Sequence, residues 1–382
     1  MKILALQNDR NRKRSVVTTS TSSLTSLQKN LCCLLYGPGK ARFEHREVTP
    51  IEDPRDYLVR ISYVGVCRSD AHFWTHGGVM RMVSDEKPLV MGHEASGIVH
   101  SVVPAVASVM PGDRVSIEPS FSYRRCKQCK ARRYNLYAGM KFAADPPDNH
   151  GTLARLFRTP GDFVYKIPDS VSLEEAVLVE PFSVAVHGAR LAGLAPGHVV
   201  LVQGSGNIGL LAAATAKAFD AKEVFVSDIN QSKLDFAKSF VGCKTFMSDS
   251  NSSPQLEPVR MKKELGIDEG ADVVLECTGV ESSVQTGIYA SGPGGVVVQI
   301  GLEKPYLTLP VLHMCEKEPV FKTAWRYAPG DYEVTLSFIS SGRISVRSLI
   351  STIVPFEKAP DAWEMTKNGH GIKNLIQSVQ DD

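Results

Sequence analysis

The chain has 382 residues, of which 43% are hydrophobic and 22% charged, and its formal net charge is +2 at pH 7. This length suits two domains, and the even charge balance excludes a strongly basic surface for nucleic acid or membranes. No apolar run reaches the roughly 18 residues of a membrane span. Eight cysteines in so long a chain do not form a disulfide framework, which favours a reduced, cytoplasmic protein.

The first 28 residues differ in composition from the rest of the chain. A basic cluster at residues 10–14 precedes a Ser/Thr-rich run at 15–26, and Asp9 is the only acidic residue. This composition weakly resembles a mitochondrial transit peptide, but it lacks a clear apolar face. We therefore expect residues 1–28 to be a disordered tail, with a misassigned start codon as an alternative explanation.

Short strands and turns are predicted from residue 31 to about residue 117. Apolar and polar residues alternate at 57–64, and further strand patterns lie at 97–103 and 114–117. A Pro-Gly-Asp turn signal stands at 111–113. This part of the chain is predicted to be mostly β.

Two clusters in this β-rich part contain residues that bind metals. The first contains Cys67, Ser69 and His72, and the second is His93-Glu94. Thiolate, imidazole and carboxylate are zinc ligands, and a catalytic zinc takes three protein ligands and keeps one open position. Each cluster alone is weak, because a single cysteine is usually a small core residue. Together, upstream of a nucleotide-binding unit, they favour a catalytic metal site.

The nucleotide-binding unit centres on Gly204, Gly206 and Gly209. These glycines have the GxGxxG spacing and follow an apolar run at 198–202. Gly204 is expected to make the tight turn, Gly206 to let the backbone approach a pyrophosphate, and Gly209 to allow close packing of helix and strand. A helix is predicted at 207–219, and its N-terminal N–H groups, with Asn207 and Ile208, would face the phosphates.

An acidic residue completes the fingerprint about 20 residues later. The second apolar run, at 224–226, ends at Asp228, which is expected to accept hydrogen bonds from the adenosine ribose hydroxyls. Its charge would repel a 2′-phosphate, so NAD(H) is predicted over NADP(H). We also place Lys233 in the cofactor-binding set.

The remaining elements continue this α/β pattern. Strands are predicted at 272–277 and 295–300, with glycine turns after each, and a turn at 293–295 precedes the second strand. A polar surface loop is expected at 248–254. Near the C-terminus, helices are expected at 331–341 and 359–368, and a strand at 350–354.

Further segments carry a resemblance to a known family: RYNL at 133–136, FAADPP at 142–147, GTL at 151–153, YKIP at 165–168, EPFSVAVH at 180–187 and DIN at 228–230. With the clusters above, the chain resembles the zinc-dependent medium-chain dehydrogenases. Within them it is similar to the polyol group of sorbitol, xylitol and L-arabinitol dehydrogenases. The Phe73-Trp74 pair is similar to the fungal xylitol and arabinitol enzymes.

The resemblance implies a two-domain α/β fold. A GroES-like, mostly β catalytic domain would comprise residues 29–190 and 323–382, and a doubly wound Rossmann NAD-binding domain would comprise 191–322. It also implies reversible, zinc-dependent oxidation of a polyol to a ketose by NAD⁺, in a homodimer or homotetramer. Xylitol, sorbitol and L-arabinitol stay open as substrates.

Roles for individual residues follow from the resemblance. Cys67 and His93 would bind zinc. Glu94 would be a third ligand or reach the metal through water, unless it only orients His93. Glu180 would bind the metal, or its water and the substrate. The remaining implied residues are the proton relay Ser69 and His72 and the substrate contacts Phe73, Phe142 and Arg326.

Three departures from the family pattern stand out. Arg68 replaces a glycine that usually follows the zinc-binding cysteine. Cys126 and Cys129 remain from a four-cysteine structural zinc site, but two tyrosines, Tyr123 and Tyr137, occupy the other positions, so we expect no structural zinc.

Asp145 replaces a threonine of the polyol pocket, and Asn149-His150 resembles a small insertion beside it. These changes leave two other functions open. One is a degenerate protein that binds NAD as a sensor or scaffold without turnover. The other is a zinc-free NAD(P)H quinone or enone reductase, against which Cys67, His93 and Asp228 argue.

Overall fold

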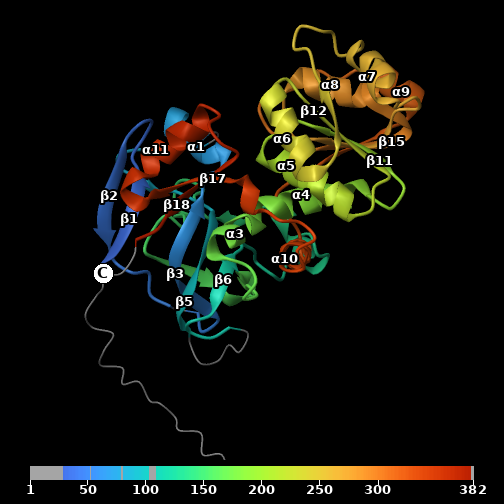
Figure 1. Cartoon of the computed structure of the whole chain (residues 1–382). Helices are drawn as coiled ribbons and strands as arrows, with labels where there is room; N and C mark the ends of the chain where they lie inside the picture. The colour runs from blue at the N-terminus through green and yellow to red at the C-terminus, as the bar shows by residue number, and fades with distance from the viewer. Residues whose placement is uncertain (1–28, 52, 79–80, 103–108, 380–382) are drawn as a thin grey trace, which may run out of the picture.

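The computed structural model describes residues 29–51, 53–78, 81–102 and 109–379, which form two lobes, each built on its own β-sheet (Figure 1). The tail predicted at 1–28 lies outside the described residues. Within the described part of the chain, no helix is long and apolar enough to cross a membrane.

The first lobe is mostly β, in agreement with the sequence pattern. Its main sheet has seven strands, and β9 joins it by pairing with β3. In spatial order the strands are β10 (Val164–Lys166), β6 (Arg114–Ile117), β5 (Glu94–Val102), β3 (Asp56–Gly65), β18 (Lys373–Gln377) and β17 (Ile350–Pro355), with β9 (Leu156–Pro160) beside β3. Two small sheets complete the lobe: β2 (Ala41–Arg46), β1 (Asn30–Leu35) and β4 (Leu89–Val90), and the pair β7 (Ser120–Phe121) and β8 (Lys141–Phe142).

The second lobe is a doubly wound α/β unit. All six strands of its sheet are parallel, and the strand order reverses between β11 and β14. Ligands bind at such a switch point in open α/β sheets. In spatial order the strands are β13 (Lys244–Met247), β12 (Glu223–Asp228), β11 (Val199–Gln203), β14 (Ala271–Glu276), β15 (Ser291–Gln299) and β16 (Val320–Thr323).

Helices cover both faces of this parallel sheet because its strands are buried on both sides. Val200 and Val202 of β11 face one hydrophobic cluster, whereas Leu201 faces the other. The first cluster contains α4 (Val179–Ala192), α5 (Asn207–Ala218), α6 (Gln231–Val241) and α10 (Asp331–Ser340). The second contains α7 (Glu257–Leu265) and α8 (Glu281–Ala290).

The remaining helices are short or lie on the first lobe. They are α1 (Arg68–His76), α2 (Lys127–Lys130), α3 (Leu173–Val177), α9 (Val311–Lys317) and α11 (Ala359–Lys367), with 3₁₀ turns η2 (Tyr134–Leu136), η3 (Gly161–Phe163), η4 (Arg347–Leu349) and η5 (Phe356–Lys358).

The turn predicted at 293–295 needs a correction. These residues lie inside β15, where the pairing with β14 moves from Ala271↔Ser291 to Val273↔Val296. The extra residues form a bulge, and Gly294 has a φ of +67° there, which suits glycine. The prediction was wrong because glycine-rich segments occur in β-bulges as well as in turns.

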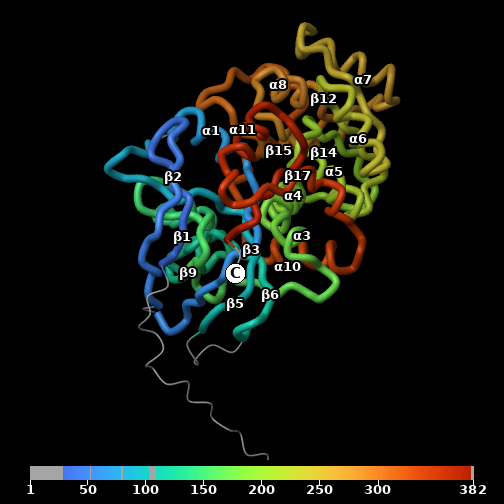
Figure 2. The backbone as a smooth tube through the Cα atoms, turned by 60° about the vertical axis from the view of Figure 1, so that its left-hand side comes forward, coloured from blue at the N-terminus to red at the C-terminus, as the bar shows by residue number. Residues whose placement is uncertain are grey.

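The last strand of the described residues, β18, lies within the first lobe's sheet. β18 pairs antiparallel with β3, in the register Leu375↔Gly65. Both views place the red C-terminal segment beside the blue N-terminal strands (Figures 1 and 2). This pairing brings residues from opposite ends of the sequence together at the carboxyl end of β3.

Candidate active site

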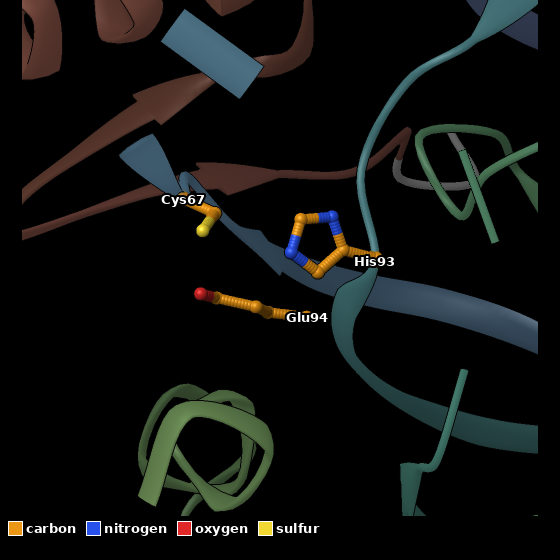
Figure 3. A group of neighbouring side chains, drawn as sticks. All are labelled: Cys67, His93 and Glu94. Carbon is orange, nitrogen blue, oxygen red and sulfur yellow. The ribbon is translucent and has the colours of Figure 1, made fainter. Parts of the chain in front are cut away.

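Three metal-binding side chains converge where β3 ends and β5 begins. Cys67 follows β3 as the N-cap of α1, and Glu94, the first residue of β5, pairs with Gly65 of β3. One ligand atom from each of Cys67, His93 and Glu94 lies within 4.8 Å of the others, and the side chains point toward one another (Figure 3). A Cβ on Gly65 would overlap the Glu94 carboxylate, so glycine is needed there.

Asp70 is a buried carboxylate that binds the first two of these residues. Its Oδ2 accepts a hydrogen bond from the Cys67 backbone N–H (2.8 Å), and its Oδ1 lies 3.8 Å from His93 Nδ1. At 3.8 Å the carboxylate acts on the ring through its charge and not through a hydrogen bond. The sequence analysis missed Asp70, although its position three residues after a helix N-cap is a capping signal.

Lys373 neutralises Glu94 from the last strand. Its Nζ donates to both carboxylate oxygens, at 2.8 and 2.6 Å, and to the Val66 carbonyl at 3.1 Å. Both side chains are at most 3% exposed. Glu94 must therefore share its oxygens with this ammonium group if it contacts a metal. Lys373 was not predicted from the sequence either. The signal that could have identified it is a lysine within a buried apolar strand.

The groups around His93 favour a positive charge at the site. Burial alone would lower the pKa of His93, but Asp70, Cys67 and Glu180 raise it to about 10. Burial raises the pKa of Glu180 to about 7, despite the opposing effect of His93. A soft thiolate, an imidazole and nearby carboxylates are the donor set that zinc prefers, so these residues fit a catalytic zinc.

Glu180 comes from a different element, the first turn of α4. It is buried on α4, and Tyr327 donates a hydrogen bond to its carboxylate. The cluster whose ligand atoms lie within 4.8 Å does not include Glu180. Direct zinc binding by Glu180 thus stays a prediction, while its electrostatic interaction with His93 places it at the site.

The predicted substrate residues fall into two groups. The Phe142 ring lies 5.3 Å from the His93 ring, and the Arg326 guanidinium lies 3.7 Å from the centre of Phe142. Phe142 therefore separates a metal ligand from a cation that can bind polyol oxygens. Phe73 is half-buried and packs against the core of the first lobe, so its substrate role stays a prediction.

The predicted proton relay, Ser69 and His72, lies on α1. Both residues are exposed and one helical turn apart. His72 Nε2 lies 3.2 Å from the Gly78 carbonyl oxygen, and its ring packs on His76. The exposure is compatible with proton exchange with solvent, and the relay itself stays a prediction.

The glycine loop has the geometry expected of a phosphate cradle. Gly204 has a φ of +89°, and a Cβ on Gly209 would overlap the Gly204 carbonyl oxygen. Open space surrounds the Cβ position of Gly206, the N-cap of α5. The buried Asn207 Oδ1 next to it has no hydrogen-bond partner in the described structure. These features fit a dinucleotide at the helix N-terminus.

Asp228 holds this loop in the described structure. Its Oδ2 accepts hydrogen bonds from the N–H and hydroxyl of Ser205, both at 2.7 Å, and its Oδ1 accepts from Asn230 N–H. Lys233 lies in the first turn of α6, where its N–H binds the capping Asn230 side chain. Ribose binding by Asp228 and cofactor contact by Lys233 stay predictions.

Comparison with known proteins identifies the family. The alcohol dehydrogenase GroES-like domain matches residues 53–169, and the zinc-binding dehydrogenase family matches 207–341. The probable D-xylulose reductase A of Neosartorya fischeri is 42% identical over 360 residues, which cover 94% of this chain and 100% of that protein. The chain belongs to the zinc-binding dehydrogenases.

Two further relatives support the same assignment. The protein of the same name from Emericella nidulans is 44% identical over 356 residues, 93% of this dehydrogenase and 98% of the relative. The crystal structure of an oxidoreductase of unknown specificity from Escherichia coli has a TM-score of 0.86 at 30% identity, covering 92% and 100% of the two chains. The expected GroES-like and Rossmann fold is confirmed.

The departures of this dehydrogenase lie near its surface. Arg68 is exposed at the start of α1. Tyr123 and Tyr137 stack on each other with ring centres 6.0 Å apart, in the segment that contains Cys126 and Cys129.

The altered pocket residues form a short hairpin. Asp145 and Asn149 exchange two backbone hydrogen bonds, and the Asp145 carboxylate lies 3.6 Å from the Arg81 guanidinium. His150 Nδ1 accepts a hydrogen bond from the Val90 N–H, so the histidine braces the hairpin against β4.

Another buried carboxyl, Glu118, was not predicted from the sequence. It lies between β6 and β7 and accepts hydrogen bonds from the hydroxyls of Tyr134 and Tyr165. Burial raises the pKa of Glu118 to about 8, although both hydrogen bonds oppose the rise. Burial therefore disfavours the charged form of this carboxyl.

Proposed function

We propose that this dehydrogenase oxidises a polyol reversibly to a ketose with NAD⁺ and one catalytic zinc, and that xylitol and D-xylulose are its preferred pair. The observation that carries the proposal is the convergence of Cys67, His93 and Glu94 in a chain 42% identical, over 94% of its length, to a D-xylulose reductase. Sorbitol and L-arabinitol are the competing substrates.

Each side chain has a defined task in this proposal. Zinc, when bound, would supply a Lewis acid that lowers the pKa of a substrate hydroxyl, and bound NAD⁺ would supply the hydride acceptor. Cys67 and His93 would hold the metal, and Asp70 would stabilise His93 through its charge. Ser69 and His72 pass the hydroxyl proton to solvent. Glu180 contacts the metal, its water or the substrate.

The substrate is positioned by the residues on the open side of the site. Phe142 provides an apolar wall, and Arg326, stacked on that wall, donates hydrogen bonds to polyol oxygens. Asp228 selects NAD⁺ because its carboxylate binds the ribose hydroxyls and repels a 2′-phosphate.

Initial rates on a panel of polyols, with NAD⁺ and NADP⁺, test this function. We expect the highest kcat/KM for xylitol with NAD⁺ and about one zinc per chain by metal analysis. Undiminished NADH binding without turnover of any polyol would instead indicate a sensor. Enone reduction by NADPH without zinc would indicate the quinone reductase alternative.

We further propose a homo-oligomer in the cytoplasm. Exposed apolar residues lie on and before the edge strand β16, including Tyr306, Leu312 and Val320, which are 87%, 78% and 46% exposed. Exposed apolar surface beside an unpaired strand edge favours association with another copy. Light scattering of the purified enzyme distinguishes a dimer or tetramer from a monomer.

A further inference from the structure

The segment that contains Cys126 and Cys129 holds two thiols in direct contact. Cys126 is the N-cap of α2, and its Sγ lies 3.2 Å from Cys129 Sγ. Both residues are partly exposed, whereas Cys32, Cys33 and Cys243 are buried. The two sulfurs need to approach by about 1 Å to reach the ~2.05 Å length of a disulfide bond.

The neighbours of these two thiols do not complete a metal site. Among the described residues, no third cysteine, histidine or carboxylate lies close enough to complete a metal site with them. The positions that could have supplied two more ligands hold the stacked rings of Tyr123 and Tyr137. Two thiolates do not close a tetrahedral zinc site, so both sulfurs are available for other chemistry.

The surroundings activate Cys126 in particular. The Cys129 N–H donates a hydrogen bond to Cys126 Sγ (3.4 Å), which lowers the pKa of that thiol. The segment 124–133 also contains six cations and no acidic residue, of which Arg124 pairs with Asp162. The remaining cations attract anionic reactants to the sulfurs.

We propose that Cys126 and Cys129 form a reversible dithiol–disulfide centre that reacts with small disulfides bearing carboxylates. The proposal rests on the contact between the two sulfurs, their exposure and the basic segment around them. It does not depend on the proposed polyol activity.

The reaction is an ordinary exchange in two steps. The Cys126 thiolate attacks one sulfur of the small disulfide, whose S–S bond breaks, and a small thiolate leaves with the bonding electron pair. Cys129 then loses its proton and attacks Cys126 Sγ, which expels the second small thiolate. Both leaving thiolates take up the protons given up by the two cysteines. Two protein thiols are thereby oxidised, and one small disulfide is reduced to two thiols.

Oxidised glutathione serves as the probe. The full-length zinc-loaded enzyme is incubated with oxidised glutathione, and the reaction is quenched with acid. An alkylating agent then labels the remaining thiols, and intact-protein mass spectrometry measures the mass of the chain. We expect the wild type to lose two alkylatable thiols, to become lighter by two hydrogen atoms, and to recover with dithiothreitol. The Cys129→Ser variant should retain one glutathione on Cys126, because the second step is blocked.

Two matched variants define the controls. Cys315→Ser removes an exposed cysteine elsewhere and should leave the loss of two thiols unchanged. The double variant Cys126→Ser/Cys129→Ser should lose none, and it should oxidise polyol at the wild-type rate. Wild-type enzyme that keeps all its thiols, or a double variant that still loses two, would overturn the proposal. A second zinc per chain that protects both thiols would overturn it as well.

Discussion

The cofactor loop is continuous in the sequence, from β11 to Asp228, whereas the residues of the metal site come from segments between Cys67 and Lys373. In the loop, the glycines depend on local geometry: Gly204 has a positive φ, and a Cβ on Gly209 would overlap the Gly204 carbonyl oxygen. In the metal site, each side chain depends on a partner brought in by the fold. A local motif is therefore visible in the sequence, and a site built from distant segments is visible only in part.

The two regions also differ in their electrostatics. The loop uses backbone N–H groups and one carboxylate that is half-exposed. The metal site buries Asp70, His93, Glu94, Glu180 and Lys373 together. Since unpaired buried charges are costly, substitutions in the metal site should have larger effects than substitutions in the loop.

The largest effect is expected for Cys67→Ser. Loss of the Lewis acid, worth several kcal/mol at ~1.4 kcal/mol per tenfold, should reduce kcat/KM for xylitol by at least about 1,000-fold. NADH binding, followed by fluorescence, should stay near wild type because the loop is separate. Cys315→Ser is the matched control and should keep full activity. Unchanged polyol oxidation by Cys67→Ser would remove zinc from the mechanism.

Lys373→Met tests the charge balance of the metal site. It leaves Glu94 buried without its ammonium partner and should lower the free energy of unfolding by about 3–5 kcal/mol. Denaturant unfolding in the presence of a chelator measures this loss without a contribution from zinc. The double variant Lys373→Met/Glu94→Gln should recover most of the stability, and its failure to do so would contradict the charge argument.

Asp228→Ala tests the cofactor loop and should change cofactor selectivity; it should also weaken NAD⁺ binding, because Asp228 holds Ser205 in the loop. Lost hydrogen bonds to a charged group, worth ~1.5–3 kcal/mol, should reduce the preference for NAD⁺ over NADP⁺ by about 10- to 100-fold. The ratio of the two kcat/KM values measures the effect. Asp235→Ala removes a nearby exposed acid on α6 and should not change the ratio. An unaltered ratio in Asp228→Ala would refute the role of this carboxylate.

Glu118→Gln should change how stability depends on pH. The folded pKa of Glu118, about 8, lies above the ~4.3 of an unfolded glutamate. Its contribution is therefore fully present below about pH 4 and is lost as pH rises through about 8, by up to ~1.4 kcal/mol per pH unit. The variant should show a shallower fall between pH 5 and 8 than both the wild type and the exposed-site control Glu357→Gln. Equal slopes would mean that Glu118 titrates normally.

Much of the fold was predictable because it follows from short-range patterns. The apolar run before Gly204 became β11, and the helix predicted at 207–219 became α5 (Asn207–Ala218). The turn expected at 293–295 failed because glycine and proline mark bulges and turns alike.

The candidate site was predictable where residue type and spacing suffice. Cys67, His93 and Glu94 converge as expected, and Phe142 lies between His93 and Arg326. Asp70 and Lys373 were missed for different reasons. Asp70 resembles a helix-capping residue. Lys373 reaches the site because β18 pairs with β3, and this long-range pairing cannot be predicted from the local sequence.

The position of Lys373 on the last strand has a consequence for biosynthesis. The ribosome exposes Cys67, His93 and Glu94 long before it adds the lysine that balances their charge. A nascent polypeptide that stops short of β18 holds an uncompensated anionic pocket and an unpaired edge on β3. The enzyme's centre is thus completed only once β18 has been synthesised.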